Sequence, residues 1–329
     1  MSHRATSRWF VSLRGRHDWS GSFYERCSAA VKYLGRCASL PVLHRWYVDF
    51  IHDDPRMYAC RLRDPRLLER HLHRFVNTHW SRRVRLLCLL SHYRFMLARL
   101  PAPLFEAIYV NGEASLGELV MKDGRVLTLS LRPSIFKGCE GELGLVLSNA
   151  EGRVLYRLVF TVIDDGSTLA IGCLQGPDGA DSRDMVRDLT RQMHGLRPKQ
   201  LMLSLAYAFA KHGGIGHILA VGNDAHPLRR RGRRFQADYD AFWQEQKGVQ
   251  GDDGWFLLPA TLDRKTEADV PSHHRSAFRR REAMRAEADR LLTLALGEGA
   301  SGNLAMDERC VGPRSEPMPR LSLEVAWIP

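Results

Sequence analysis

A short turn, His194–Lys199, opens an apolar helix and is the strongest candidate for a ligand-binding site in this sequence. Pro198 stands where a first-turn proline belongs, and the first amide groups of a helix have no partners within it. These groups and the positive end of the helix dipole attract anions, and Arg197 and Lys199 add two cations. Together with Gly195, they predict an anion site; a plain helix start with solvated cations is the alternative.

Four further polar side chains stand where strands and helices are predicted to end or begin. Gln175 closes a predicted strand, and open sheets bind ligands beyond such strand ends. Asn223 and His226 follow a short apolar strand, and Tyr239 belongs to a helix with an apolar face. His226 could serve as a general base and Tyr239 as a general acid. A turn histidine and a core aromatic are the alternatives.

The signatures of several enzyme classes are absent from the sequence. It contains no G-x-S-x-G elbow, no H-E-x-x-H and no Walker A run, the patterns of hydrolases, metalloproteases and phosphate-binding loops. The seven cysteines are never spaced as C-x-x-C, and the histidines lack helical spacing with carboxylates. We therefore predict no metal site and no disulfide framework.

The periods of the apolar residues predict the elements that hold these turns. Four strands joined by glycine-containing turns are expected to form an antiparallel meander, at 126–131, 142–147, 154–163 and 168–174. A polar helix over 182–194 follows, and then a buried helix that begins at Pro198 and is capped by Gly213. Further strands are predicted at 218–221 and 255–259, and a charged helix at 273–296. This order predicts an α+β (α/β-like) fold, with helices packed on a mostly antiparallel sheet.

A basic helical region precedes the sheet. Apolar side chains recur at three- and four-residue steps over 81–100, which predicts an amphipathic helix, and Pro101 and Pro103 end it. We predict a domain organisation of four segments: a weakly ordered N-terminus at 1–27, a basic helical region at 28–103, an α/β domain at 104–296 and a disordered tail at 297–329.

Charge is distributed unevenly along the 329 residues, whose formal net charge is +11. Residues 1–100 contain 19 Lys/Arg and 7 Asp/Glu, a net of +12. This excess suits an anionic membrane surface or an acidic protein partner. Nucleic acid is not favoured, because no basic segment is interleaved with aromatics in a binding motif. The run Arg229–Arg234 is predicted to be a loop, either solvated or in contact with phosphate.

No run of apolar residues is long enough for a transmembrane helix, and the basic N-terminus lacks the apolar core of a secretory signal. We therefore expect a cytoplasmic protein, or one bound peripherally at the inner membrane.

Several separate strings carry a family resemblance. IGCLQGP, RDLTRQMHGLRPKQLML, ILAVGNDAH, ADYDAFW and WFLLP occur in that order, preceded by SHYRFM and EGELGLVL. Over residues 28–292 the chain resembles the VirK/YbjX family of bacterial proteins, a domain of unknown function. The resemblance implies a setting in virulence, the cell envelope or resistance to antimicrobial peptides.

The predicted architecture is also similar to the plan of GNAT acyltransferases, in which a helix start after the fourth strand holds the coenzyme A pyrophosphate. The resemblance implies an acyl-CoA cofactor held by Gly195, Arg197, Pro198, Lys199, Gln175 and Asn223. Tyr239 or His226 would then transfer a proton. The acyltransferase turn Q/R-x-x-G-x-G/A is absent, and the extra helix at 182–194 departs from the plan. The alternative is a non-catalytic accessory or regulatory protein whose basic helical region binds an anionic membrane surface or acidic partner.

Overall fold

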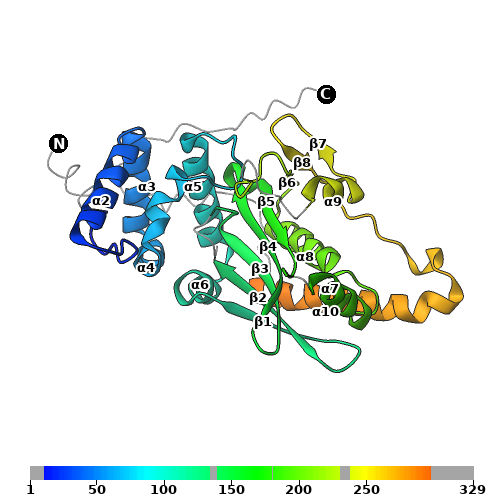
Figure 1. The fold of residues 1–329 in the computed structure, drawn as a ribbon. Coiled ribbons are helices and arrows are strands. Elements are labelled where there is room, and N and C mark those ends of the chain that lie inside the picture. Colours follow the sequence, from blue (N-terminus) through cyan, green and yellow to red (C-terminus); the bar gives the residue numbers. More distant parts are fainter. Residues whose placement is uncertain (1–10, 134–138, 180, 230–237, 298–329) are drawn as a thin grey trace.

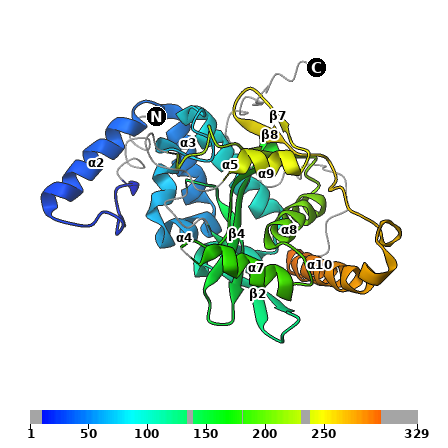
Figure 2. The same cartoon turned by 45° about the vertical axis from the view of Figure 1, so that its right-hand side comes forward.

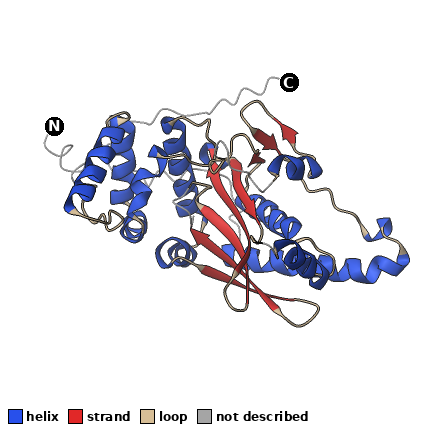
Figure 3. Ribbon diagram, in the orientation of Figure 1, coloured by secondary structure: helices blue, strands red, loops and turns tan. Residues whose placement is uncertain are grey.

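An eight-stranded open sheet forms the centre of the protein, with helices on both sides (Figures 1 and 3). The computed structural model describes residues 11–133, 139–179, 181–229 and 238–297. The sheet is antiparallel except for one pair of strands, so the predicted α+β class is confirmed. The strand order is β1-β2-β3-β4-β5-β6-β8-β7.

Five consecutive strands form an antiparallel meander. Their bounds are β1 (Ala114–Val120), β2 (Val126–Pro133), β3 (Leu143–Asn149), β4 (Val154–Ile163) and β5 (Thr168–Gln175). The turn between β3 and β4 closes as predicted, with Gly152 in the left-handed region at φ 77° and its N–H donating to Asn149 O (3.0 Å). Residues of β3 and β4 are almost all buried, as expected for central strands covered on both faces.

The first strand is the main element that periodicity did not predict. β1 is irregular, because its register against β2 shifts between Ser115 and Gly117, and Gly117 has φ 141°. A bulge of this kind places two residues opposite one and breaks the alternation of buried and exposed positions. The strand that ends at Gln175 is therefore the fifth of the sheet, one more than the sequence predicted.

The parallel pair lies next to the meander. β5 pairs with β6 (His217–Val221) after a crossover through α7 (Ser182–Gln192) and α8 (Pro198–Gly213). The antiparallel strands β8 (Trp255–Leu257) and β7 (Val249–Gln250) complete the sheet, preceded by α9 (Tyr239–Glu245). The left-handed cap of α8 is Gly214 (φ 71°), because Gly213 still belongs to the helix; the prediction that Gly213 is the cap was wrong.

The N-terminal third is helical and packs on one side of the sheet, with α8 and α10 (Arg275–Leu296) on the other (Figures 1 and 2). Its α-helices are α2 (Phe23–Cys37), α3 (Pro41–Asp53), α4 (Pro55–Arg63), α5 (Arg82–Arg99) and α6 (Ala102–Glu106), together with the 3-10 helix η1 (Pro65–Leu72) and the π-helix η2 (Ala107–Asn111). α5 packs against β4, where His92 Nδ1 accepts from the backbone of Val162 (3.1 Å).

One buried charged cluster joins this helical third to the sheet. Arg70 of η1 is ion-paired with Glu142, which directly precedes β3, and with Asp64 (2.6 Å). The Tyr93 hydroxyl of α5 donates to Glu142 (2.5 Å). Glu142 is fully buried, and burial raises its pKa to about 7 against the lowering effect of Arg70.

Apolar side chains from both sides of the predicted boundary at residues 103 and 104 form one continuous buried cluster. At the N-terminal boundary, α2 begins at Phe23, before residue 28. Most of the tail predicted at 297–329 and of the loop Arg229–Arg234 lies outside the described residues. Within the described part, no helix combines the length and apolar character needed to cross a bilayer.

Candidate functional site

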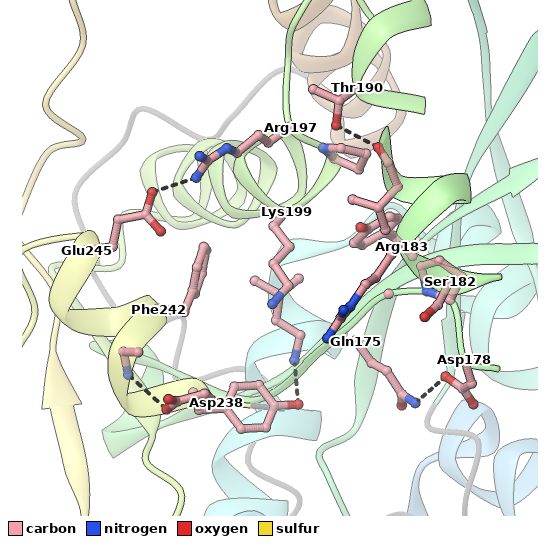
Figure 4. A pocket seen from close by; sticks show the side chains of 18 of the residues that line it. Gln175, Asp178, Ser182, Arg183, Thr190, Arg197, Lys199, Asp238, Phe242 and Glu245 are labelled. Carbon is pink, nitrogen blue, oxygen red and sulfur yellow. Dashed lines mark hydrogen bonds and ion pairs between the residues drawn. The ribbon is translucent and has the colours of Figure 1, made fainter. Parts of the chain in front are cut away.

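A cavity of about 1190 Å³ opens between α7, α8, α9 and the end of β5 (Figure 4). Its origin lies in the parallel pair, because the pairing of β5 with β6 ends at Ile171 and Ala220 while β5 continues to Gln175. Clefts beyond the carboxyl ends of adjacent parallel strands are common ligand sites. Six of the predicted site residues line it: Gln175, Arg197, Pro198, Lys199, His226 and Tyr239.

The start of α8 forms one wall of the cavity. Pro198 is the first helical residue, no side chain of the described residues caps the helix, and its first turn contains no acidic residue, so the positive end of its dipole faces the cavity. Lys199 is half-buried, its ammonium lies 5.1 Å from the centre of the Phe242 ring, and burial lowers its pKa. Arg197 is more exposed and pairs with Glu245 of α9 (2.8 Å).

A second cationic row, on α7, was not predicted as part of the site. Arg183, Arg187 and Arg191 recur every four residues and line the same cavity. Arg187 pairs with Asp184 (3.0 Å) and Arg191 with Asp188 (2.8 Å). Within the described residues, Arg183 and Lys199 form no ion pair, and Figure 4 shows both side chains directed into the cavity.

Carboxylates occupy the other parts of the lining. Asp238 caps α9 by accepting from Ala241 N (3.1 Å), and this backbone hydrogen bond lowers its pKa. Asp178 lies beyond β5 and accepts from Gln175 (3.0 Å). The lining is therefore polarised: Lys/Arg side chains come from α7 and α8, and Asp/Glu side chains from α9, the end of β5 and the loop before β3.

The loop before β3 supplies the most buried carboxylate, Glu140, which sequence reasoning missed. It is 5% exposed, and its carboxylate lies 3.6 Å from His226 Nε2 and 3.7 Å from Arg157. Burial raises its pKa, with Arg157 acting in the opposite direction. A carboxylate with a raised pKa at a cavity wall is suited to accepting a proton.

His226 lies beside Glu140 and is almost fully buried. Its Nδ1 accepts from Leu228 N (3.2 Å), so the neutral ring carries its proton on Nε2, the nitrogen nearest Glu140. Burial lowers the pKa of His226 to about 4. In this arrangement Nε2 lies next to the Glu140 carboxylate and the ring packs on Tyr239. The predicted role of His226 as a proton acceptor stays a prediction.

Tyr239 stacks on His226, with ring centres 5.1 Å apart. Its hydroxyl accepts from Leu174 N (3.2 Å) and donates to Cys173 Sγ (3.6 Å). Burial raises its pKa well above the usual value, which keeps the phenol protonated at neutral pH. The side chain lines the cavity and also fixes α9 to β5, and its predicted role as a general acid is untested.

Two predicted residues, Gly195 and Asn223, do not line the cavity. Gly195 (φ 84°), together with His194 (φ 56°), reverses the chain between α7 and α8. Asn223 follows β6, donates to Asp238 (3.0 Å) and accepts from Tyr239 N (2.9 Å). Both residues therefore position the elements that carry the lining.

Comparisons with known proteins identify the family. Residues 23–292 match the family described as a protein of unknown function (DUF535). The chain belongs to the DUF535 family. The DUF535 chain is 32% identical over 284 residues to the uncharacterized protein YbjX of Escherichia coli strain K12, covering 84% of this chain and 86% of that protein. The resemblance to the VirK/YbjX family is thus confirmed.

Other relatives of the DUF535 chain are also similar over large parts of their length. An uncharacterized protein of Haemophilus influenzae is 24% identical over 77% of this chain and 82% of its own length. The membrane protein LapB of Mannheimia haemolytica is 27% identical over 53% of this chain and 74% of its own length. No solved structure matches the DUF535 chain significantly.

Proposed function

We propose that this DUF535 protein transfers an acyl group from a coenzyme A thioester to an amine on an envelope-related or peptide substrate. The observation that carries the proposal is the uncapped start of α8, which faces the same cavity as Lys199, Arg183 and the buried carboxylate Glu140. The α8 start lies between the parallel strands β5 and β6, and a helix start that follows a strand is the feature it shares with the GNAT plan, from which the intervening α7 departs.

The residues present suit a coenzyme A donor. An uncapped helix start with adjacent cations favours a pyrophosphate, and Arg183 and Lys199 have no competing ion pair among the described residues. Phe242 and Val186 add apolar surface for the non-charged part of a donor. Bound there, an acyl-CoA supplies a carbonyl carbon to the acceptor nitrogen and a thiolate leaving group.

The carboxylates suit an amine acceptor. A protonated amine is attracted to the side of the lining that holds Asp178, Asp238 and Glu140. The ammonium group first releases one proton to solvent to become a nucleophile. As its nitrogen bonds to the acyl carbon it loses a second proton, which Glu140 accepts because burial raises its pKa; the C–S bond breaks, and the departing thiolate takes up a proton. Arg157 and His226, both within 3.7 Å of the Glu140 carboxylate, hold it in position.

Isothermal titration calorimetry with acetyl-CoA and a long-chain acyl-CoA tests donor binding. We expect Arg183→Ala and Lys199→Ala each to weaken binding by roughly tenfold, because each removes a charge-assisted contact to phosphate. The matched control is Arg290→Ala, an exposed arginine of α10 that does not line the cavity. Absence of binding at millimolar donor, or equal affinity in all variants, would exclude the donor site.

We also propose that the protein associates with an anionic membrane surface through its basic helical third. The net charge of +12 over residues 1–100 supports this, and a relative is named membrane protein LapB. Co-flotation with phosphatidylglycerol vesicles and with phosphatidylcholine vesicles, at low and high salt, measures the association. Retention that neither requires the anionic lipid nor falls with salt contradicts the proposal.

A further inference from the structure

Helix α2 projects from the helical third into solvent (Figure 2). Its C-terminal half is anchored, since Tyr33 is buried and its hydroxyl contacts Ser12 Oγ (3.1 Å) and His44 Nε2 (2.9 Å), and Cys37 is also buried. Residues 21–28, in contrast, are all exposed. The first two turns of α2 therefore have almost no packing partner among the described residues.

The projecting part carries apolar side chains on one face. Phe23, Cys27 and Val31 recur every four residues, and Tyr24 lies beside them. The exposed fractions are 71% for Phe23, 86% for Tyr24 and 69% for Val31, among the largest of any bulky apolar side chain described. A surface helix normally buries its apolar stripe against the core. An exposed apolar stripe therefore indicates a site that binds a membrane or another protein.

The helix is already formed in the absence of that cover. Ser22 and Glu25 make a reciprocal capping box, in which Ser22 N donates to Glu25 Oε2 (2.6 Å) and Glu25 N to Ser22 Oγ (3.4 Å). A capped helix loses little conformational entropy when it binds. The apolar face is thus presented in a fixed orientation.

The charges around this apolar face favour an anionic lipid surface as its binding partner over a second copy of the chain. Arg26 and Lys32 lie on either side of it, against the single acid Glu25 of α2. Two basic faces would repel each other, whereas anionic head groups attract them. The three bulky side chains expose roughly 400 Å² in total, about half of what each partner buries in a stable dimer.

We propose that α2 is the lipid-contacting element of the protein, lying along an anionic bilayer with Phe23, Tyr24 and Val31 inserted below the head groups. This inference rests on the proposed membrane association and names its contact site. The arrangement of aromatic and aliphatic side chains on one face and basic ones beside it is that of interfacial helices. The helix lies on the bilayer and does not cross it.

Vesicle co-flotation with the full chain tests the proposal. We expect Phe23→Ser/Tyr24→Ser/Val31→Ser to reduce the affinity for phosphatidylglycerol vesicles by at least roughly tenfold, because apolar insertion is lost. The matched control is Val120→Ser/Val249→Ser/Leu294→Ser, three side chains that are 61–65% exposed on other elements. Because both triple variants alter exposed positions, thermal unfolding should show both to be folded.

A probe at Cys27 gives an independent readout on the same face. Cys27 is exposed whereas Cys37, Cys60, Cys88 and Cys173 are buried, so an environment-sensitive fluorophore can be attached to it in a Cys139→Ser/Cys310→Ser background. We expect blue-shifted emission on addition of phosphatidylglycerol vesicles and none with phosphatidylcholine vesicles.

The outcomes separate this inference from the membrane proposal on which it rests. Vesicle binding that persists in the α2 triple variant, with no emission shift at Cys27, overturns the role of α2 and leaves membrane association intact. No binding by the wild type overturns both. An emission shift with protein concentration alone, lost in the triple variant, identifies a second copy as the partner and also overturns the inference.

Discussion

Two groups of charged side chains, the Arg70 cluster and the cavity beside α8, differ in how their charges are arranged. In the cluster, Arg70 contacts Glu142 and Asp64 directly, and the Arg70 and Glu142 side chains are 4% and 0% exposed. In the cavity, Lys199 and Arg183 stand apart from the carboxylates and face an open volume. Matched and buried charges stabilise one arrangement of the chain, whereas charges separated across a cavity remain available to a ligand.

Two glutamates in one loop make this comparison directly testable. Glu142 belongs to the Arg70 cluster, and Glu140, two positions earlier, belongs to the cavity. Both are buried and both have raised pKa values. If the arrangement of charges decides the role, then equivalent changes at the two positions should have different consequences.

The largest effect is expected at Glu142. The change Glu142→Leu should lower the free energy of unfolding by about 3–5 kcal/mol, because it leaves Arg70 as a buried charge without its closest partner. Urea denaturation followed by circular dichroism measures this. The double variant Arg70→Met/Glu142→Leu should recover part of the loss, and a double variant no more stable than the single one would contradict a paired role.

Glu140→Gln is expected to act on turnover. It should lower the rate of acyl transfer by roughly 10²-fold or more, since it removes the proton acceptor, while acyl-CoA affinity changes little. Calorimetry and single-turnover assays separate the two quantities. If the rate of acyl transfer at saturating donor is unchanged, Glu140 has only a structural role, as Glu142 does.

Three buried histidines predict how the free energy of unfolding depends on pH. Burial lowers the pKa values of His44 and His226 to about 4 and that of His92 to about 3. Below about pH 6.5 the unfolded chain therefore binds protons at these histidines that the folded chain does not. Their contribution to the free energy of unfolding is complete above that pH and is lost as the pH falls toward 4. At pH 5 the loss is about 2 kcal/mol per histidine at most.

Urea titrations at several pH values test this histidine contribution. The variant His226→Gln should show a weaker pH dependence than the wild type, and Val120→Ser, which changes an exposed residue and no titratable group, serves as the control. Equal slopes in all three proteins would show that other groups dominate acid unfolding.

The smallest effect is expected for the ion pair at the edge of the cavity. Arg197 and Glu245 are 62% and 49% exposed, so Glu245→Gln should change the free energy of unfolding by no more than about 0.5 kcal/mol. The same change frees Arg197 and should strengthen acyl-CoA binding slightly. Weaker binding would show that Glu245 contributes to the ligand contacts.

The apolar runs were sufficient to predict the central strands, because nearly every residue of β3 and β4 is buried, even though their pairing shifts register at Leu147/Ser148 and at Val159/Phe160. They failed for β1, whose bulge at Gly117 disturbs the alternation. The α8 wall was predicted from local features alone, a proline in the first turn and adjacent cations. Glu140 carried no such local signal, because its partners Arg157 and His226 reach it only through the folded sheet.

The parallel pairing of β5 with β6 also has a consequence for the order of folding. Each hairpin of the meander joins strands that are neighbours in sequence, but Ile171 pairs with Ala220 only after the chain has crossed over through two helices. Closing the longer loop costs more entropy and slows the contact. We therefore expect the meander to form first and the ligand cavity last. A newly made chain would hold five of the eight strands before the cavity had formed.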